Sequence, residues 1–134
     1  MRRKNMGAMH RFQAIRQYQN SGVAGGALDA RPEQLVSMLL EGVLDRLARA
    51  RGASRNGDHQ VRIANVRGAI SILEYLRVCL DKRGGQITER LDALYDFCLR
   101  RLAQANAAAD PAMLEEVSDV LRPLKAAWDE LPAR

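Results

Sequence analysis

Apolar residues recur at steps of three and four over four long stretches of the chain, which is the spacing of an amphipathic helix. The third stretch carries the row Ile87, Leu91, Leu94, Cys98, Leu102 and Ala105. The fourth carries the row Leu114, Val117, Leu121, Leu124, Trp128 and Leu131. Because few segments alternate in the manner of a strand, and β-branched residues are scattered, the pattern predicts helices and no sheet.

Turn and cap residues separate these stretches. Pro32 suits a first helical turn, since its missing N–H would have no partner there. Residues 56–58 (Asn-Gly-Asp) predict a turn, and Asp110 followed by Pro111 predicts the start of the fourth helix. Pro123 falls inside that helix and predicts a kink or a break.

The second helix is predicted over about residues 58–82, with a stop at the glycine pair 84–85, because glycine adopts the left-handed conformation that ends many helices. The third is predicted over about residues 86–107. Short connections force neighbouring helices to run antiparallel. The chain is therefore predicted to be all-α, with an elongated up-down-up-down four-helix bundle over residues 29–134.

A basic leader, residues 1–28, precedes this bundle, and it is predicted to be flexible or to form a short helix over residues 9–19. The leader holds five of the 21 Lys and Arg residues and none of the 16 Asp and Glu residues. The net charge of +5 therefore belongs to the leader, and the bundle is neutral by count. A nucleic-acid-binding domain usually carries its excess charge on the folded surface, so no nucleic-acid partner is predicted.

Groups that could support catalysis are sparse. His10 and His59 lie in the leader and in a turn, and Cys79 and Cys98 lack metal-ligand spacing. Both cysteines are predicted to be free thiols packed as small apolar residues. The Glu-x-x-His pairs of a di-iron bundle and the pattern of a phosphate-binding loop are missing. The chain is predicted not to be an enzyme and to use no metal or cofactor.

The sequence also bears on the compartment. It has no run of about 18 or more uncharged apolar residues, so no stable membrane insertion is predicted. The basic residues 2–4 are not followed by the apolar segment of a secretory signal. Together with free thiols, these features favour the cytoplasm.

Several segments together resemble the flagellin export chaperones of the FliS type, from about Ile15 to Trp128. The most specific match is LDKRGGQI at residues 80–87, followed by LDALYDFCLRRL at residues 91–102. A shorter match begins with PEQL and continues to MLLEG, within residues 32–42. The match is long and specific, so the chain is identified as a member of this family.

The resemblance implies a cytosolic chaperone that binds the C-terminal helical segment of flagellin. It would prevent premature polymerisation and support delivery to the flagellar type III export apparatus. Other flagellar export or regulatory proteins are further candidate partners, and the chain would be a monomer or a homodimer. Since that flagellin segment is disordered in the free monomer, a long interface is needed to offset its ordering.

The resemblance also suggests binding residues. Ile15 and Tyr18 in the leader are predicted to lie over a hydrophobic cleft or to gate the client's access to it. The predicted cleft-lining residues are Leu39, Leu40, Val43 and Ile63. For each of these four, a place in the core is the alternative. Tyr95 and Trp128 lie on the apolar rows and are predicted to be mostly core.

The alternative function is a helical protein that binds nucleic acid or an anionic surface through its basic leader. It predicts that deleting residues 1–14 abolishes binding and that affinity falls steeply with salt. The chaperone hypothesis predicts weak salt dependence, and loss of binding when Tyr18 or the cleft leucines are substituted.

Overall fold

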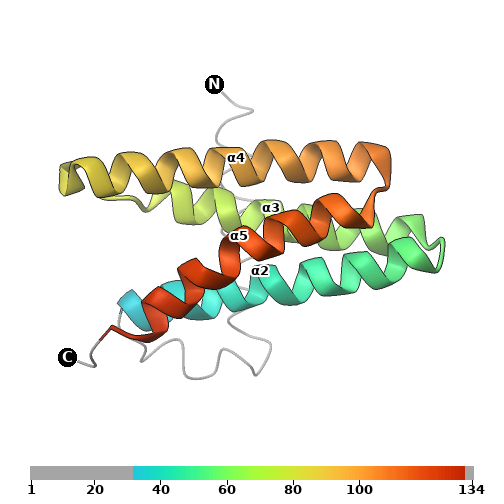
Figure 1. The fold of residues 1–134 in the computed structure, drawn as a ribbon, viewed down its shortest axis with the longest axis horizontal. Helices are drawn as coiled ribbons and strands as arrows, with labels where there is room; N and C mark the ends of the chain where they lie inside the picture. Colours follow the sequence, from blue (N-terminus) through green and yellow to red (C-terminus); the bar gives the residue numbers. More distant parts are fainter. Residues whose placement is uncertain (1–31, 132–134) are drawn as a thin grey trace, which may run out of the picture.

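A computed structural model describes residues 32–131, and within that range the chain forms four long helices and no strand (Figure 1). Each helix packs against two others: α2 against α3 and α5, and α4 against the same two. This arrangement confirms the predicted all-α four-helix bundle. The elements are α2 (Pro32–Arg55), α3 (His59–Val78), the short 3-10 helix η1 (Lys82–Gly84), α4 (Gln86–Ala108) and α5 (Pro111–Asp129).

Aspartate side chains cap two of the helix starts, at Asp58 and at Asp110, and the cap at Asp110 was predicted. Asp58 begins α3, and its carboxylate accepts a hydrogen bond from the backbone N–H of Val61 at 3.2 Å. Asp110 does the same for α5, accepting from the N–H of Ala112 at 3.0 Å. Each carboxylate satisfies a donor that the first helical turn leaves without a partner. Gly57, with φ of 74°, supplies the left-handed backbone of the turn before α3.

Two predictions about helix ends are corrected. Helix α3 ends at Val78 and not near residue 82, because Asp81 accepts the N–H of Arg83 at 2.9 Å and so begins η1. Gly85 has φ of 64° but precedes α4 instead of stopping α3. Pro123 does not break α5, which is continuous from its first to its last residue. Pro123 is exposed, so the carbonyl that loses its helical partner can bond to water.

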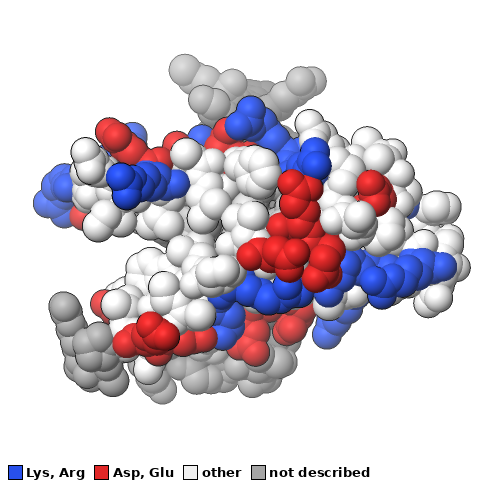
Figure 2. All heavy atoms as spheres, in the orientation of Figure 1, with Lys and Arg blue, Asp and Glu red and all other residues white. Residues whose placement is uncertain are grey.

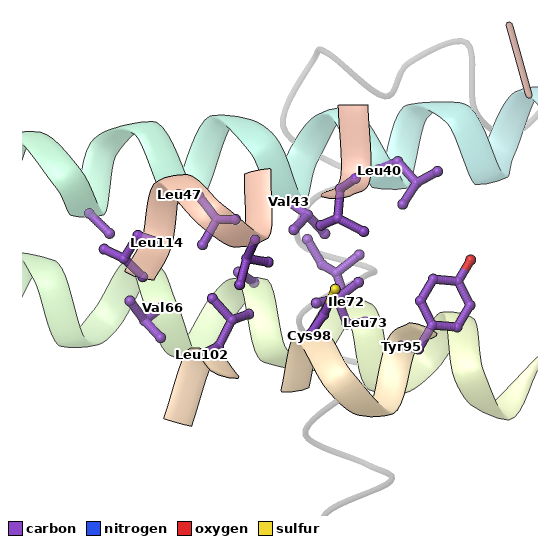
Figure 3. Close-up of a cluster of buried hydrophobic side chains, with 14 of the residues drawn as sticks. Leu40, Val43, Leu47, Val66, Ile72, Leu73, Tyr95, Cys98, Leu102 and Leu114 are labelled. Atoms are coloured by element: carbon purple, nitrogen blue, oxygen red, sulfur yellow. The ribbon is translucent and has the colours of Figure 1, made fainter. Parts of the chain in front are cut away.

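The core lies along the axis of the bundle and draws on all four helices (Figure 3). The labelled residues in that view are Leu40, Val43, Leu47, Val66, Ile72, Leu73, Tyr95, Cys98, Leu102 and Leu114. All are at most 2% exposed. Full burial of one leucine or valine side chain is worth roughly 1.5–3 kcal/mol, so these residues account for much of the stability of the bundle.

The leader, residues 1–28, and the short helix expected over residues 9–19 lie outside the described residues, as do Ile15 and Tyr18. Within residues 32–131, no helix combines the length and the apolar character that crossing a membrane requires.

Candidate functional site

The two ends of the bundle differ in how they are closed. The end that holds the α2–α3 and α4–α5 turns is called the polar end here, and it is built around Arg62, whose exposure is 5%. The guanidinium of Arg62 donates from Nε to Oδ1 of Asn106 at 3.3 Å and from Nη2 to the carbonyl oxygen of Asn106 at 3.2 Å. Its Nη1 lies 2.8 Å from Nδ1 of His59. Arg62 thus places a cation against the C-terminal carbonyls of α4, which the helix dipole favours.

Further hydrogen bonds tie α2 to the α4–α5 turn and to α5 at the polar end. Ser54 Oγ donates to the carbonyl of Ala109 at 3.2 Å, and Arg51 Nη1 donates to Oγ of Ser118 at 2.9 Å. Arg51 also pairs with Glu115, with 3.0 Å between Nε and Oε2. This end is therefore held by directional contacts in one geometry.

The opposite end holds the start of α2, the end of α3, the start of α4 and the end of α5. Between them lies a cavity of about 540 Å³, called the end cavity here. Apolar side chains from all four helices line it: Val36, Leu76, Leu80, Ile87, Leu91 and Trp128. Figure 2 shows the molecule hollowed at this end, between α4 and α5, with uncharged atoms around the opening. The lining can shelter apolar side chains of a partner from water.

Several of these lining residues are reachable from outside. Ile87, in the first turn of α4, is 72% exposed, and Trp128 is partly buried while it packs against the core. Nearby Val78 is 68% exposed. Scattered apolar residues on a surface are ordinary, but a cluster around an apolar cavity that residues 32–131 leave open is typical of an interaction site.

Ion pairs hold the outer side of this end. Arg77 on α3 donates to Asp92 on α4 through two nitrogens, at 2.7 and 3.2 Å, and to Asp96 at 3.0 Å. The hydrogen bond from Arg77 lowers the pKa of Asp92. Within the last turn of α5, Nζ of Lys125 donates to Oδ2 of Asp129 at 2.7 Å. These groups keep the helix ends in place around the cavity without filling it.

The predicted cleft residues lie mostly elsewhere. Leu39, Leu40 and Val43 are at most 1% exposed and belong to the core, so on this structure they offer a partner no surface. Ile63 is partly buried on α3, towards the polar end. For the three α2 residues the structure favours the core, which was the alternative prediction. Tyr95 is 2% exposed, as predicted for a core residue.

Sequence reasoning missed four of the lining residues, namely Val36, Leu80, Ile87 and Leu91, as members of a site. Each lies among the apolar positions of a predicted helix, but none was named as a candidate binding residue. A usable signal was present, since Leu80 and Ile87 flank the glycine pair 84–85 and therefore lie where the helices end. Apolar residues at the ends of a bundle have fewer helices to pack against than residues at its middle.

Polar and titratable side chains also line the end cavity, namely Glu33, Cys79, Asp81, Thr88 and Tyr95. Cys98 is buried, and burial raises the pKa of its thiol to about 11; burial also raises the pKa of Tyr95 to about 12. Cys79 was predicted to be packed but is exposed beside the cavity, because α3 ends one residue earlier. Among residues 32–131, no group of three or more His, Cys, Asp or Glu side chains could hold a metal ion. The arrangement favours binding of an apolar segment.

Fold and site together define a small helical bundle whose described residues, 32–131, leave a largely apolar cavity at one end. The family model for the flagellar protein FliS matches residues 13–134. The chain belongs to the FliS family.

Three relatives align with this chain over nearly the whole of their own length. The flagellar secretion chaperone FliSB of Pseudomonas aeruginosa is 38% identical over 122 residues, covering 90% of this chain and 97% of the relative. The flagellar secretion chaperone FliS of Vibrio cholerae is 35% identical, covering 89% of this chain and 88% of the relative. The flagellar secretion chaperone FliS of Escherichia coli is 36% identical and covers 91% of both chains.

Proposed function

We propose that the chain is a cytoplasmic, non-enzymatic export chaperone that binds the C-terminal helical segment of flagellin. Binding keeps that segment from polymerising early and supports its delivery to the flagellar type III export apparatus. Family membership supports the chaperone role. The end cavity, lined by apolar residues of all four helices and left unfilled by residues 32–131, is the observation that favours a binding role at this end.

The chemistry of the client fits this surface. The resemblance to the family implies that the flagellin segment forms amphipathic helices, whose apolar faces bind one another in the filament. A chaperone has to cover such a face, and a helix laid against an apolar groove does so with large side chains as anchors. Ordering a disordered segment costs free energy, which limits the affinity and makes release for export easier.

We assign the anchoring role first to the end cavity, with Ile87 and Trp128 as the residues a client would contact. Ile63, carried over from the resemblance, is a secondary candidate contact outside the end cavity, and two residues of helix put it on the opposite face of α3 from Val61. Ile15 and Tyr18, carried over from the resemblance, are proposed to lie over the apolar surface and to gate the client's access. Other flagellar export or regulatory proteins are candidate partners of the same surface, and the chain is proposed to act as a monomer or a homodimer.

Co-purification with the cognate flagellin tests this proposal. Intact flagellin is expected to be retained by the tagged chain, and flagellin without its last roughly forty residues is expected to be lost, since a segment of that helical length can span the bundle. The matched pair Ile87→Glu and Val61→Glu serves as a control on the surface used. These residues are 72% and 43% exposed, so neither variant should unfold the bundle. Ile87 lies near the start of α4 and Val61 near the start of α3, at opposite ends of the bundle.

Equal retention of intact and truncated flagellin would overturn the proposal. A complex that forms with nucleic acid instead, and that dissolves steeply with added salt, would favour the alternative function. Deleting residues 1–14 separates the two hypotheses, because it removes four of the five basic residues of the leader and none of the residues that line the end cavity.

A further inference from the structure

The first nine residues of α4, Gln86–Leu94, are anchored differently from the rest of that helix and are called the α4 flap here. The buried residues of α4 are Tyr95, Cys98, Leu102 and Ala105, so none of them lies in the flap. By contrast, α5 reaches its first buried residue, Leu114, at its fourth position. Few buried apolar contacts are the physical condition for local opening at low cost.

Cavities border two neighbouring faces of the flap, and Thr88 lines both of them. Ile87, Thr88 and Leu91 face the end cavity of about 540 Å³. Thr88 and Glu89 also border a second cavity of about 510 Å³, which lies between the flap and the end of α3. A helix segment with space on two sides has room to shift without displacing core side chains.

The start of the flap is held by one side-chain hydrogen bond. Thr88 Oγ1 donates to the carbonyl of Asp81 at 2.6 Å. Gly85 precedes the helix without a capping side chain, so the first N–H groups of α4 gain no partner from it. Gly84 allows the close approach, because a Cβ at that position would lie 2.1 Å from Thr88 Oγ1. The connection between η1 and the start of α4 is therefore closely packed, but few side-chain hydrogen bonds hold it.

The end of the flap is held by ion pairs on its outer side. Arg77 binds Asp92, inside the flap, through two parallel hydrogen bonds, and Asp96, in the anchored part of α4, through a third. Asp96 is held in turn by Arg100, with 2.9 Å between Nη2 and Oδ2. A bidentate guanidinium–carboxylate pair fixes orientation as well as distance. Arg77 therefore sits where the flap joins the anchored helix.

We infer that the α4 flap is a hinged lid over the end cavity, with Arg77 as the positioning residue that sets how far it stands from α2 and α5. The inward shift of the flap would bring Ile87 and Leu91 towards Val36 and Trp128 across the cavity. Its outward shift would widen the cavity for an apolar side chain of the client. The role of the lid in client binding rests on the proposed function, whereas its motion does not.

Native-state hydrogen exchange of the full chain tests the motion. Amides of residues 90–94, which lie beyond the first helical turn, are expected to exchange at least about tenfold faster than amides of residues 99–103. In Arg77→Gln, exchange at residues 90–94 is expected to rise by a further factor of about five to ten, because the ion pairs to both aspartates are lost. Exchange at residues 99–103 should stay unchanged.

Arg101→Gln is the matched control. Arg101 pairs with Glu116 on α5 at 2.8 Å, and its side chain is 34% exposed, close to the 35% of Arg77. Unlike the pair of Arg77 with Asp92, this pair has no member in the flap. Arg101→Gln is expected to leave exchange at residues 90–94 unchanged. The inference would be overturned if residues 90–94 were protected like residues 99–103, or if Arg77→Gln accelerated exchange uniformly along α4.

A further experiment tests the role of the lid in client binding. It adds the flagellin C-terminal segment and follows the one tryptophan of the chain, Trp128. Binding is expected to slow exchange at residues 90–94 and to protect Trp128 from acrylamide quenching. If calorimetry shows binding while neither signal changes, the lid role is wrong and the proposed function stands. If the segment does not bind at all, the proposed function fails and the lid role fails with it. The Arg77→Gln comparison still decides whether the flap moves.

Discussion

The polar end and the end cavity belong to one bundle but differ in what fills the space between the helices. At the polar end, buried Arg62 and its partners close the space with hydrogen bonds, and no buried side-chain nitrogen or oxygen in residues 32–131 lacks a partner. At the other end, apolar side chains face a cavity of about 540 Å³. Directional bonds fix one arrangement, whereas an unfilled apolar cavity gives up packing contacts that a partner could restore. The difference separates the part that holds the fold from the part proposed to bind.

The largest expected difference is in stability. Leu102→Ala removes a fully buried core side chain and is expected to lower the free energy of unfolding by about 2–5 kcal/mol. Ile87→Ala, at a position that is 72% exposed, is expected to change it by less than about 0.5 kcal/mol. Urea denaturation of both variants measures the contrast. A similar loss in the two variants would mean that the end cavity is part of the core.

Thiol reactivity is expected to separate the two cysteines. The pKa of Cys98 is raised to about 11 by burial, so at pH 8 its thiolate is roughly a hundredfold rarer than for a thiol with the ordinary pKa. Cys79 is exposed beside the end cavity and should react promptly with a disulfide reagent. One thiol is expected to react in the folded chain and the second only on unfolding. Simultaneous reaction of both would show that the core opens readily.

Removal of the buried guanidinium tests the polar end. Arg62→Ala leaves the carbonyl and the amide oxygen of Asn106 without their donor, and it is expected to cost about 1–3 kcal/mol of stability. Flagellin binding, corrected for the folded fraction, is expected to stay unchanged. Arg62→Lys keeps the charge but not the forked geometry of the guanidinium, so its stability should lie between that of the parent chain and that of Arg62→Ala. A loss of binding by folded Arg62→Ala would contradict the division of roles between the ends.

The smallest expected effect concerns pH. The pKa of Asp92 is lowered from the ordinary 3.8 by the hydrogen bond from Arg77, so the folded state holds this carboxylate ionised. Its contribution to stability is fully present above about pH 4 and is lost as the pH falls through the lowered pKa. Asp92→Asn should therefore narrow the drop in urea midpoint between pH 5 and pH 2. An equal drop in the variant and the parent chain would show that Arg77 and Asp92 do not interact in solution.

The fold was predictable because its causes are local. The three- and four-residue spacing of apolar positions, with Asp58 and Asp110 as caps, places α3 and α5, and short connections set the antiparallel order. The end of α3 was missed, because Asp81 competes for a local cap and glycine 85 serves the next helix instead. Such choices between neighbouring caps depend on small free-energy differences that a pattern does not resolve.

The site was less predictable than the fold. An apolar row does not say which of its members the other helices cover, and Leu40 and Ile87 look alike in sequence although one is fully buried and the other 72% exposed. Their difference comes from position along the bundle: Leu40 lies in the core, inside α2, whereas Ile87 lies in the first turn of α4, where the helices end. Burial is a property of the assembled fold, so residues on the same row can have opposite roles.

The most direct test of the central claim is calorimetry with the flagellin C-terminal segment and the matched pair Ile87→Glu and Val61→Glu. A charge at the end cavity is expected to weaken binding at least about tenfold, because an apolar anchor of the client would meet an unpaired carboxylate. Val61→Glu, which puts the same charge at the polar end, is expected to bind the segment with the same affinity as the parent chain. Unchanged binding by Ile87→Glu, together with a loss in Val61→Glu, would contradict the account.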